Sequence, residues 1–228
     1  MMSLGRRQGW AGRLVGCTVV TLFFGALAES LSAQIGQPVG VSAGVVSANW
    51  RGSEYERDDT QPLTGIRFEV NTRFPISGEL SVLVAGVYAE KGAHEPVRGD
   101  FGYRVRIRYL EAPVLLQFEL PSYGRFTPRV HVGPYVGVRL DCRVNVVPFL
   151  EPDDPDTVGC DTVSIRPGWG DVGVVAGAGA KLDLGGSLAV TISARREWGL
   201  RSVSVGSRGN ANNRAFSFLA GLEFDPGR

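Results

Sequence analysis

Apolar and polar side chains alternate along several long stretches of the sequence, and this period of two restricts the fold more than any other feature. Within residues 63–74, Ile66 and Phe68 occupy even positions, whereas Arg67 and Glu69 occupy odd positions. Successive side chains of a β-strand point to opposite faces, so the pattern predicts a strand with one apolar and one polar face. No segment shows the pattern of a long amphipathic helix, and we therefore expect an all-β fold.

Eight segments show this alternation, and the connections between them are alternately long and short. Outer-membrane barrels combine short turns at one end with longer loops at the other. We therefore predict an eight-stranded antiparallel up-and-down transmembrane β-barrel that forms one domain, residues 34–228, after a cleaved signal peptide. The predicted strands are residues 39–50, 63–74, 79–93, 103–120, 126–144, 168–184, 187–200 and 214–224.

The first 33 residues have the organisation of a secretory signal peptide. Three arginines within residues 1–13 precede an apolar stretch, residues 14–28, and small residues follow it. Fifteen apolar residues are short for an uncleaved membrane helix, which needs about 20. We expect cleavage after Ala33, with Ala28 as the alternative.

Composition excludes two further classes of protein. The mean hydropathy of +0.01 does not fit a bundle of membrane helices, but it fits barrel strands, in which every second residue is apolar. Lysine and arginine number 24 against 23 acidic residues, so the basic surface of a nucleic-acid-binding protein is absent and no nucleic-acid partner is expected.

Export to an oxidising compartment gives meaning to the two cysteines that remain after cleavage. Cys142 and Cys160 flank a proline-containing segment, and we predict a disulfide between them, with free thiols as the alternative. They have no nearby histidines, so a zinc site is not expected.

Alternation alone does not reveal which face points inward. A soluble periplasmic barrel that binds a small ligand would bury the apolar face, whereas a membrane barrel buries the charged one. Strands of about 12 to 18 residues favour the membrane barrel, because globular strands have about 5 or 6. The lumen charges then predicted are Arg67, Glu69, Arg73, Arg104, Arg106, Arg108, Glu119, Arg129, Arg139, Asp171, Lys181, Arg195 and Glu197.

An interior of eight strands is just wide enough to be filled by side chains. We expect salt bridges to fill this interior. The less favoured alternative is a narrow lumen that conducts anions. Glycine is abundant, at 31 residues, and Gly173, Gly177 and Gly179 share one strand face, where they would leave room for arginines. The apolar parity changes near Glu111 and Pro113, which predicts a β-bulge there.

At these residues the sequence resembles the PorT-like outer-membrane β-barrel family. The matching motifs are Tyr109, Leu110, Glu111 and Pro113 in one strand and Gly133, Pro134 and Tyr135 in the next, together with residues 91–93. The resemblance implies a barrel of about eight strands in the outer membrane of a Gram-negative-type bacterium. It also implies outer-membrane lipid and the barrel assembly machinery as partners, but it implies little about activity.

Candidate catalytic and metal-binding groups are few. His94 and His131 are the only histidines, and neither belongs to a pattern specific to a hydrolase. The acidic residues of 151–156 lack the spacing and glycine of an EF-hand, so we read them as a solvated loop rather than a calcium site. We therefore expect no catalytic, metal or cofactor site.

The sequence thus predicts a non-enzymatic protein that acts through its external loops or in envelope integrity. The alternatives are a soluble periplasmic ligand-binding barrel and a lipid-modifying outer-membrane barrel enzyme. The sequence does not identify an external ligand or protein partner.

Overall fold

A computed structural model describes residues 36–52, 60–95, 101–148, 156–160, 168–203 and 210–227, and the predicted signal peptide lies outside them. The strands are β1 (Val39–Arg51), β2 (Gln61–Ser77), β3 (Leu80–Glu95), β4 (Phe101–Glu119), β5 (Phe126–Pro148), β6 (Asp156–Gly159), β7 (Gly170–Gly185), β8 (Leu188–Ser202) and β9 (Asn212–Phe224). No helix in these segments is long and apolar enough to cross a membrane.

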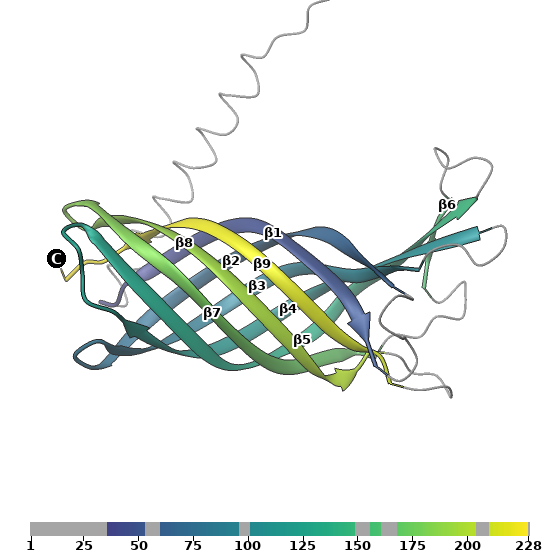
Figure 1. Cartoon of the computed structure of the whole chain (residues 1–228), viewed down its shortest axis with the longest axis horizontal. Coiled ribbons are helices and arrows are strands. Elements are labelled where there is room, and N and C mark those ends of the chain that lie inside the picture. The colour runs from purple at the N-terminus through teal and green to yellow at the C-terminus, as the bar shows by residue number, and fades with distance from the viewer. Residues whose placement is uncertain are drawn as a thin grey trace, which may run out of the picture.

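Eight of these strands form a closed antiparallel barrel, drawn on its side in Figure 1. The order around the barrel is β1, β2, β3, β4, β5, β7, β8 and β9, and β9 pairs again with β1 from Val39↔Phe224 to Arg51↔Asn212. Closure pairs the backbone of every barrel strand on both sides, which removes the exposed edges that a bilayer does not tolerate. The predicted fold is confirmed.

The two ends of the barrel differ. Short turns join β2 to β3, β4 to β5 and β7 to β8 at one end, which we call the turn end, and Val39 and Phe224 also lie there. The connections from β1 to β2, β3 to β4, β5 to β7 and β8 to β9 leave the opposite end, which we call the loop end. In outer-membrane barrels the short turns are periplasmic and the longer connections are external.

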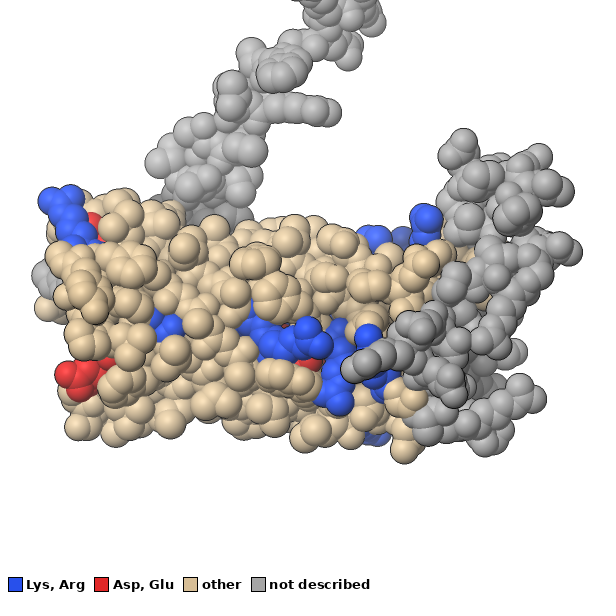
Figure 2. Space-filling model, viewed as in Figure 1, with Lys and Arg blue, Asp and Glu red and all other residues tan. Residues whose placement is uncertain are grey.

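The apolar face of the strands lies outside and the polar face inside. On β2, Arg67 and Glu69 are 1% and 2% exposed, whereas Ile66 and Phe68 are 44% and 48% exposed. The outward residues of the other strands form one apolar band with these, and Figure 2 shows a mostly uncharged surface along the barrel. This orientation is that of a barrel surrounded by lipid.

The expected β-bulge at Glu111 and Pro113 is wrong. Outward and inward residues keep alternating through this part of β4, and the irregular pairing with β5 lies instead at Arg108 and Tyr109, where Leu140 is the additional residue. The apolar parity changes in the sequence because the surroundings change: the barrel interior becomes apolar toward the loop end. The strand itself does not reverse its faces.

A short hairpin extends β5 beyond the barrel (Figure 1). β6 pairs only with β5, and a disulfide joins Cys142 to Cys160 at its base, as the sequence predicts. The backbone N–H of Cys160 also donates a hydrogen bond of 3.3 Å to the carbonyl oxygen of Cys142. The sequence analysis missed β6, because a four-residue strand beside several prolines shows no readable alternation.

Replacing both Cys142 and Cys160 by serine should loosen this hairpin and leave the barrel folded. Closing a loop of about 15 residues contributes about 3 kcal/mol, equivalent to about 100-fold in local opening. We expect faster proteolysis after residue 142 and unchanged heat-modifiable gel mobility, measured on the same membrane preparation. Loss of heat-modifiable mobility would show that the disulfide supports the barrel itself.

Candidate functional site

Lys91 of β3 is the centre of a buried cluster of charges in the lumen. Its ammonium group pairs with the carboxylates of Glu111 on β4 and Glu197 on β8, and it lies 3.7 Å from Asp171 on β7. Arg67 of β2 pairs with Glu197 and lies 3.6 Å from Glu111. All five side chains are at most 2% exposed, so five strands are joined across the lumen.

Aromatic and amide groups complete this Lys91 cluster. The ammonium nitrogen lies 4.6 Å from the ring centroid of Tyr135 and 5.8 Å from that of Tyr109, within range of cation–π attraction. The hydroxyl of Tyr135 and the side-chain amide of Asn213 each donate a hydrogen bond of 2.9 Å to Asp171. A buried charge is tolerated where it is paired and hydrogen-bonded, and this cluster provides both.

A second group of ion pairs lies nearer the turn end. The guanidinium group of Arg129 donates two hydrogen bonds, of 2.6 and 2.9 Å, to Glu223 and lies 2.8 Å from Glu119. Arg73 lies 3.5 Å from both carboxylates and 3.6 Å from Asp225. β2, β4, β5 and β9 are therefore joined at this level as well.

Between the two groups, Arg195 of β8 forms a two-pronged contact with Glu69 of β2, and Asn71 donates a further hydrogen bond of 3.0 Å to Glu69. The lumen thus contains ion pairs at three successive levels. Arginine suits this role because its planar guanidinium group matches a carboxylate in two-pronged geometry.

Glycines of β7 make room for these side chains. A Cβ atom on Gly177 would lie 2.6 Å from Nε2 of His131 and 2.9 Å from Cγ of Arg195. A Cβ atom on Gly173 would lie 2.6 Å from the ring of Tyr135. Because such distances are shorter than van der Waals contact, the glycine-rich face is what lets large interior residues fit into a narrow barrel.

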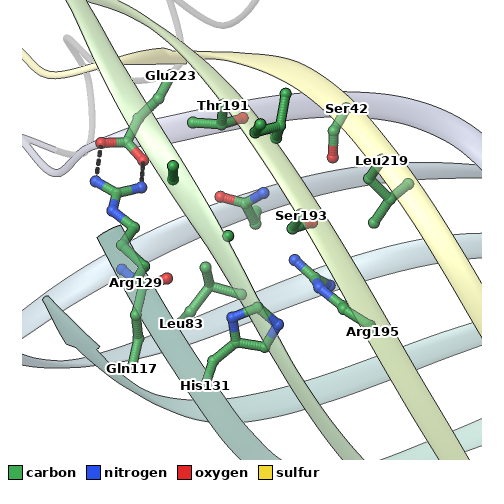
Figure 3. A pocket seen from close by; sticks show the side chains of 15 residues that line it. Ser42, Leu83, Gln117, Arg129, His131, Thr191, Ser193, Arg195, Leu219 and Glu223 are labelled. Carbon is green, nitrogen blue, oxygen red and sulfur yellow. Dashed lines mark hydrogen bonds and ion pairs between the residues drawn. The ribbon is translucent and has the colours of Figure 1, made fainter. Parts of the chain in front are cut away.

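One small polar cavity remains between the middle and turn-end ion pairs. In Figure 3, Arg129 and Glu223 lie at one side of it, and His131 and Arg195 point into it from β5 and β8. The cavity has a volume of about 40 Å³, which is room for about three water molecules. Binding sites for small molecules occupy roughly 300–1,000 Å³, so this cavity does not suit an organic ligand.

An apolar cluster closes the lumen near the loop end. Trp50, Ile107, Val144, Cys160 and Val203 belong to it, and each is at most 7% exposed. Within the described segments, ion pairs at three levels and this apolar cluster therefore occupy the lumen.

The structure supports the interior placement of most predicted lumen charges and corrects three. Arg104, Arg106 and Arg108 lie on the outer face of β4, where they alternate with the inward residues Val105 and Ile107. The prediction that they line the lumen is wrong. It assigned every charged residue to the inner face, whereas the interior of this part of the barrel is apolar. On the interior side lie Arg67, Glu69, Arg73, Glu119, Arg129, Arg139, Asp171, Lys181, Arg195 and Glu197.

Among the buried lumen charges of the described segments, the prediction missed three: Lys91, Glu111 and Glu223. Lys91 and Glu111 belong to the motifs that carry the family resemblance, and this resemblance was the one signal in the sequence that marked them. The alternation of apolar and polar residues did not reveal Lys91, because the interior positions before it, such as Val87 and Ala89, are apolar and buried.

The remaining motif residues have structural roles. Tyr109, Glu111 and Tyr135 converge on Lys91, whereas Leu110 is 50% exposed on the outer face. A Cβ atom on Gly133 would lie 2.1 Å from the carbonyl oxygen of Val114, so this position requires glycine. Pro113 is buried and Pro134 is exposed, in keeping with the alternation of β4 and β5.

Neither histidine has a partner typical of catalysis in the described segments. Nε2 of His131 has no hydrogen-bond partner there, and His94 lies near the loop end of β3. Within the same segments, no group of three His, Cys, Asp or Glu side chains is placed to hold a metal ion. Residues 151–155 of the acidic segment lie outside the described residues.

A model of the outer membrane protein β-barrel domain matches residues 28–205 of the sequence. The chain belongs to this family. None of the curated proteins compared with it matches in sequence.

Solved structures of other outer-membrane barrels are similar in fold to this member of the outer membrane protein β-barrel family. Neisserial surface protein A is 11% identical, with a TM-score of 0.49 over 83% of this chain and 97% of that one. OprG of Pseudomonas aeruginosa is 10% identical, with a TM-score of 0.48 over 82% and 95%. The outer membrane protease OmpT of Escherichia coli is 8% identical, with a TM-score of 0.35 over 82% and 96%.

Replacing Lys91 by methionine should destabilise the barrel by about 3–5 kcal/mol, because buried carboxylates then lose their shared cation. The free energy of unfolding in urea, measured by tryptophan fluorescence in lipid vesicles, tests this. The double variant K91M/E111Q removes one of the orphaned charges and should regain part of the loss. Equal stability of K91M and the wild-type barrel would contradict the role assigned to Lys91.

Replacing Gly177 by valine should cost about 1–3 kcal/mol through overpacking against the carbonyl oxygen of Ala194 and the side chains of His131 and Arg195. The matched control is Gly86→Val on β3, where an added Cβ atom meets nothing within 4 Å. In the same unfolding assay, G86V should stay within about 0.5 kcal/mol of the wild-type barrel. If both variants behave alike, the space left by Gly177 is not required.

Proposed function

We propose that the protein is a non-enzymatic, non-conducting barrel of the outer membrane of a Gram-negative-type bacterium. In this proposal it is a rigid membrane anchor that acts through the segments at its loop end or in envelope integrity. The observation that carries the proposal is the filled lumen. Ion pairs at three levels and an apolar cluster occupy the interior, and the one cavity described above holds about 40 Å³.

The same interior argues against the other functions considered. A ligand-binding barrel needs a chamber of roughly 300 Å³ or more, and it would place its apolar faces inward rather than outward. A lipid-modifying enzyme needs a catalytic group that an acyl chain can reach, but His131 is 6% exposed inside the small cavity.

The finer assignment to PorT-like barrels is also part of the proposal. It is supported by the positions of Tyr109, Glu111 and Tyr135, three motif residues that meet at Lys91. The motif is thereby explained as the part of the sequence that fills the lumen, and it requires no substrate. Outer-membrane lipid and the assembly machinery are the partners that this assignment implies.

Planar-bilayer recording at high salt should show no discrete conductance steps for the purified barrel. The physical reason is that an ion would have to displace buried pairs such as Arg67 and Glu197, which are at most 2% exposed. Heat-modifiable mobility of the reconstituted sample verifies that folded protein is present. Reproducible single-channel steps from that sample would refute the closed-lumen proposal.

A further inference from the structure

We propose that the outer face of β3, β4 and β5 near the loop end binds one phosphate-bearing lipid. Its phosphate would lie on Arg106 and Arg108, and one of its acyl chains would lie in the adjoining apolar groove. The inference goes beyond the proposed function, and it does not depend on whether the lumen conducts ions.

Two arginines on this face are oriented by one buried carboxylate. Glu90 faces outward on β3 yet is only 6% exposed. Arg106 donates to one of its oxygens at 3.1 Å, and Arg108 donates to the other at 3.2 Å. The hydroxyl of Tyr88 also donates to Glu90, at 3.1 Å. The guanidinium groups are therefore held in place before any ligand arrives, which lowers the entropic cost of binding.

A third arginine extends the cluster onto β5. Asp141 accepts hydrogen bonds from Arg108 at 3.3 Å and from Arg143 at 3.0 Å. Arg106, Arg108 and Arg143 thus surround two acidic groups, which leaves one net positive charge. Their side chains are 42%, 33% and 54% exposed, and each guanidinium group has five N–H donors, more than these contacts use. A phosphate group fits the planar donor edges that remain.

The cluster lies at the border of the apolar band. On the outer face of β4, Leu110, Val114 and Leu116 are 45–50% exposed, and the next outward residues toward the loop end are Arg108 and Arg106. Lipid headgroups lie where an apolar band ends, so the arginines are at the depth of a phosphate rather than of an acyl chain.

An apolar groove begins beside the cluster and runs across the outer faces of β9, β1, β2, β3 and β4. Small residues, including Ala43, Gly86 and Ala220, line it together with the larger side chains of Phe68 and Leu110. The groove has a volume of about 580 Å³. Tyr88 lines it and also contacts Glu90, and Leu110 follows Arg108 by two residues on the same face.

This continuity selects a lipid as the occupant. A second copy of the barrel would bring its own apolar band to the groove, but that band offers no anion for the arginines. A phosphate-bearing lipid supplies both groups in one molecule. Its phosphate would meet the arginines at the border of the apolar band, and its acyl chain would meet the groove beside them.

Native mass spectrometry of the detergent-solubilised barrel, titrated with dioleoyl phosphatidic acid, tests the proposal. We expect one retained lipid, bound about tenfold more tightly than dioleoyl phosphatidylcholine, whose phosphate is neutralised by its choline group. R106Q/R108Q should lose that preference. R196Q/R214Q removes the same charge from the outer faces of β8 and β9, and it should bind like the wild-type protein.

Gly86→Phe tests the groove without altering any charge, since an added Cβ atom there meets nothing within 4 Å. It should weaken binding of both lipids about tenfold, by excluding several methylene groups. Equal losses in R106Q/R108Q and R196Q/R214Q would overturn the proposal in favour of general attraction. Wild-type binding by G86F, competition by inorganic phosphate as strong as by the lipid, or a dimer in place of the lipid adduct would also overturn it.

Discussion

The need to fill a narrow lumen with paired charges is the constraint on which the rest of this barrel depends. Water solvates an isolated ammonium or carboxylate far better than a protein interior does, so each buried charge must find a partner. Lys91, Arg67 and their three acidic neighbours come from five strands and meet only in one register. A slip of one residue would turn each side chain to the other face, and the pairs therefore specify the register of the sheet.

Much of the fold was accessible from the sequence because one physical rule operates along each strand. Residues 39–50 were predicted as a strand and the structure has Val39–Arg51; residues 126–144 were predicted and β5 extends to Pro148. Alternation marks a strand wherever its two faces meet different surroundings. It fails where those surroundings exchange: near Tyr109 the interior becomes apolar and the outside becomes basic, so the hydropathy pattern shifts although the strand does not.

The candidate site was less predictable, because pairing across a barrel depends on how strands are staggered. Arg67 and Glu197 are 130 residues apart, and Arg195 and Glu69 are 126 residues apart. Each residue is visible as a charge on a polar face, but nothing local in the sequence states which strand lies opposite. Lys91 was harder still, since a single lysine after apolar interior positions carries no alternation of its own. The outward cluster around Glu90 became recognisable only once the three arginines of β4 were placed outside.

The pairing of β1 with β9 has a consequence for the time at which the protein is able to fold. The first and last strands of the barrel are partners along their whole length, from Val39↔Phe224 to Arg51↔Asn212. Any shorter chain emerging during synthesis leaves two open strand edges and a row of hydrated interior charges, neither of which a bilayer accepts. The barrel is therefore able to close and insert only after β9 has been synthesised. Such late, long-range closure is slow by nature, which makes protection from aggregation in transit a requirement of this architecture.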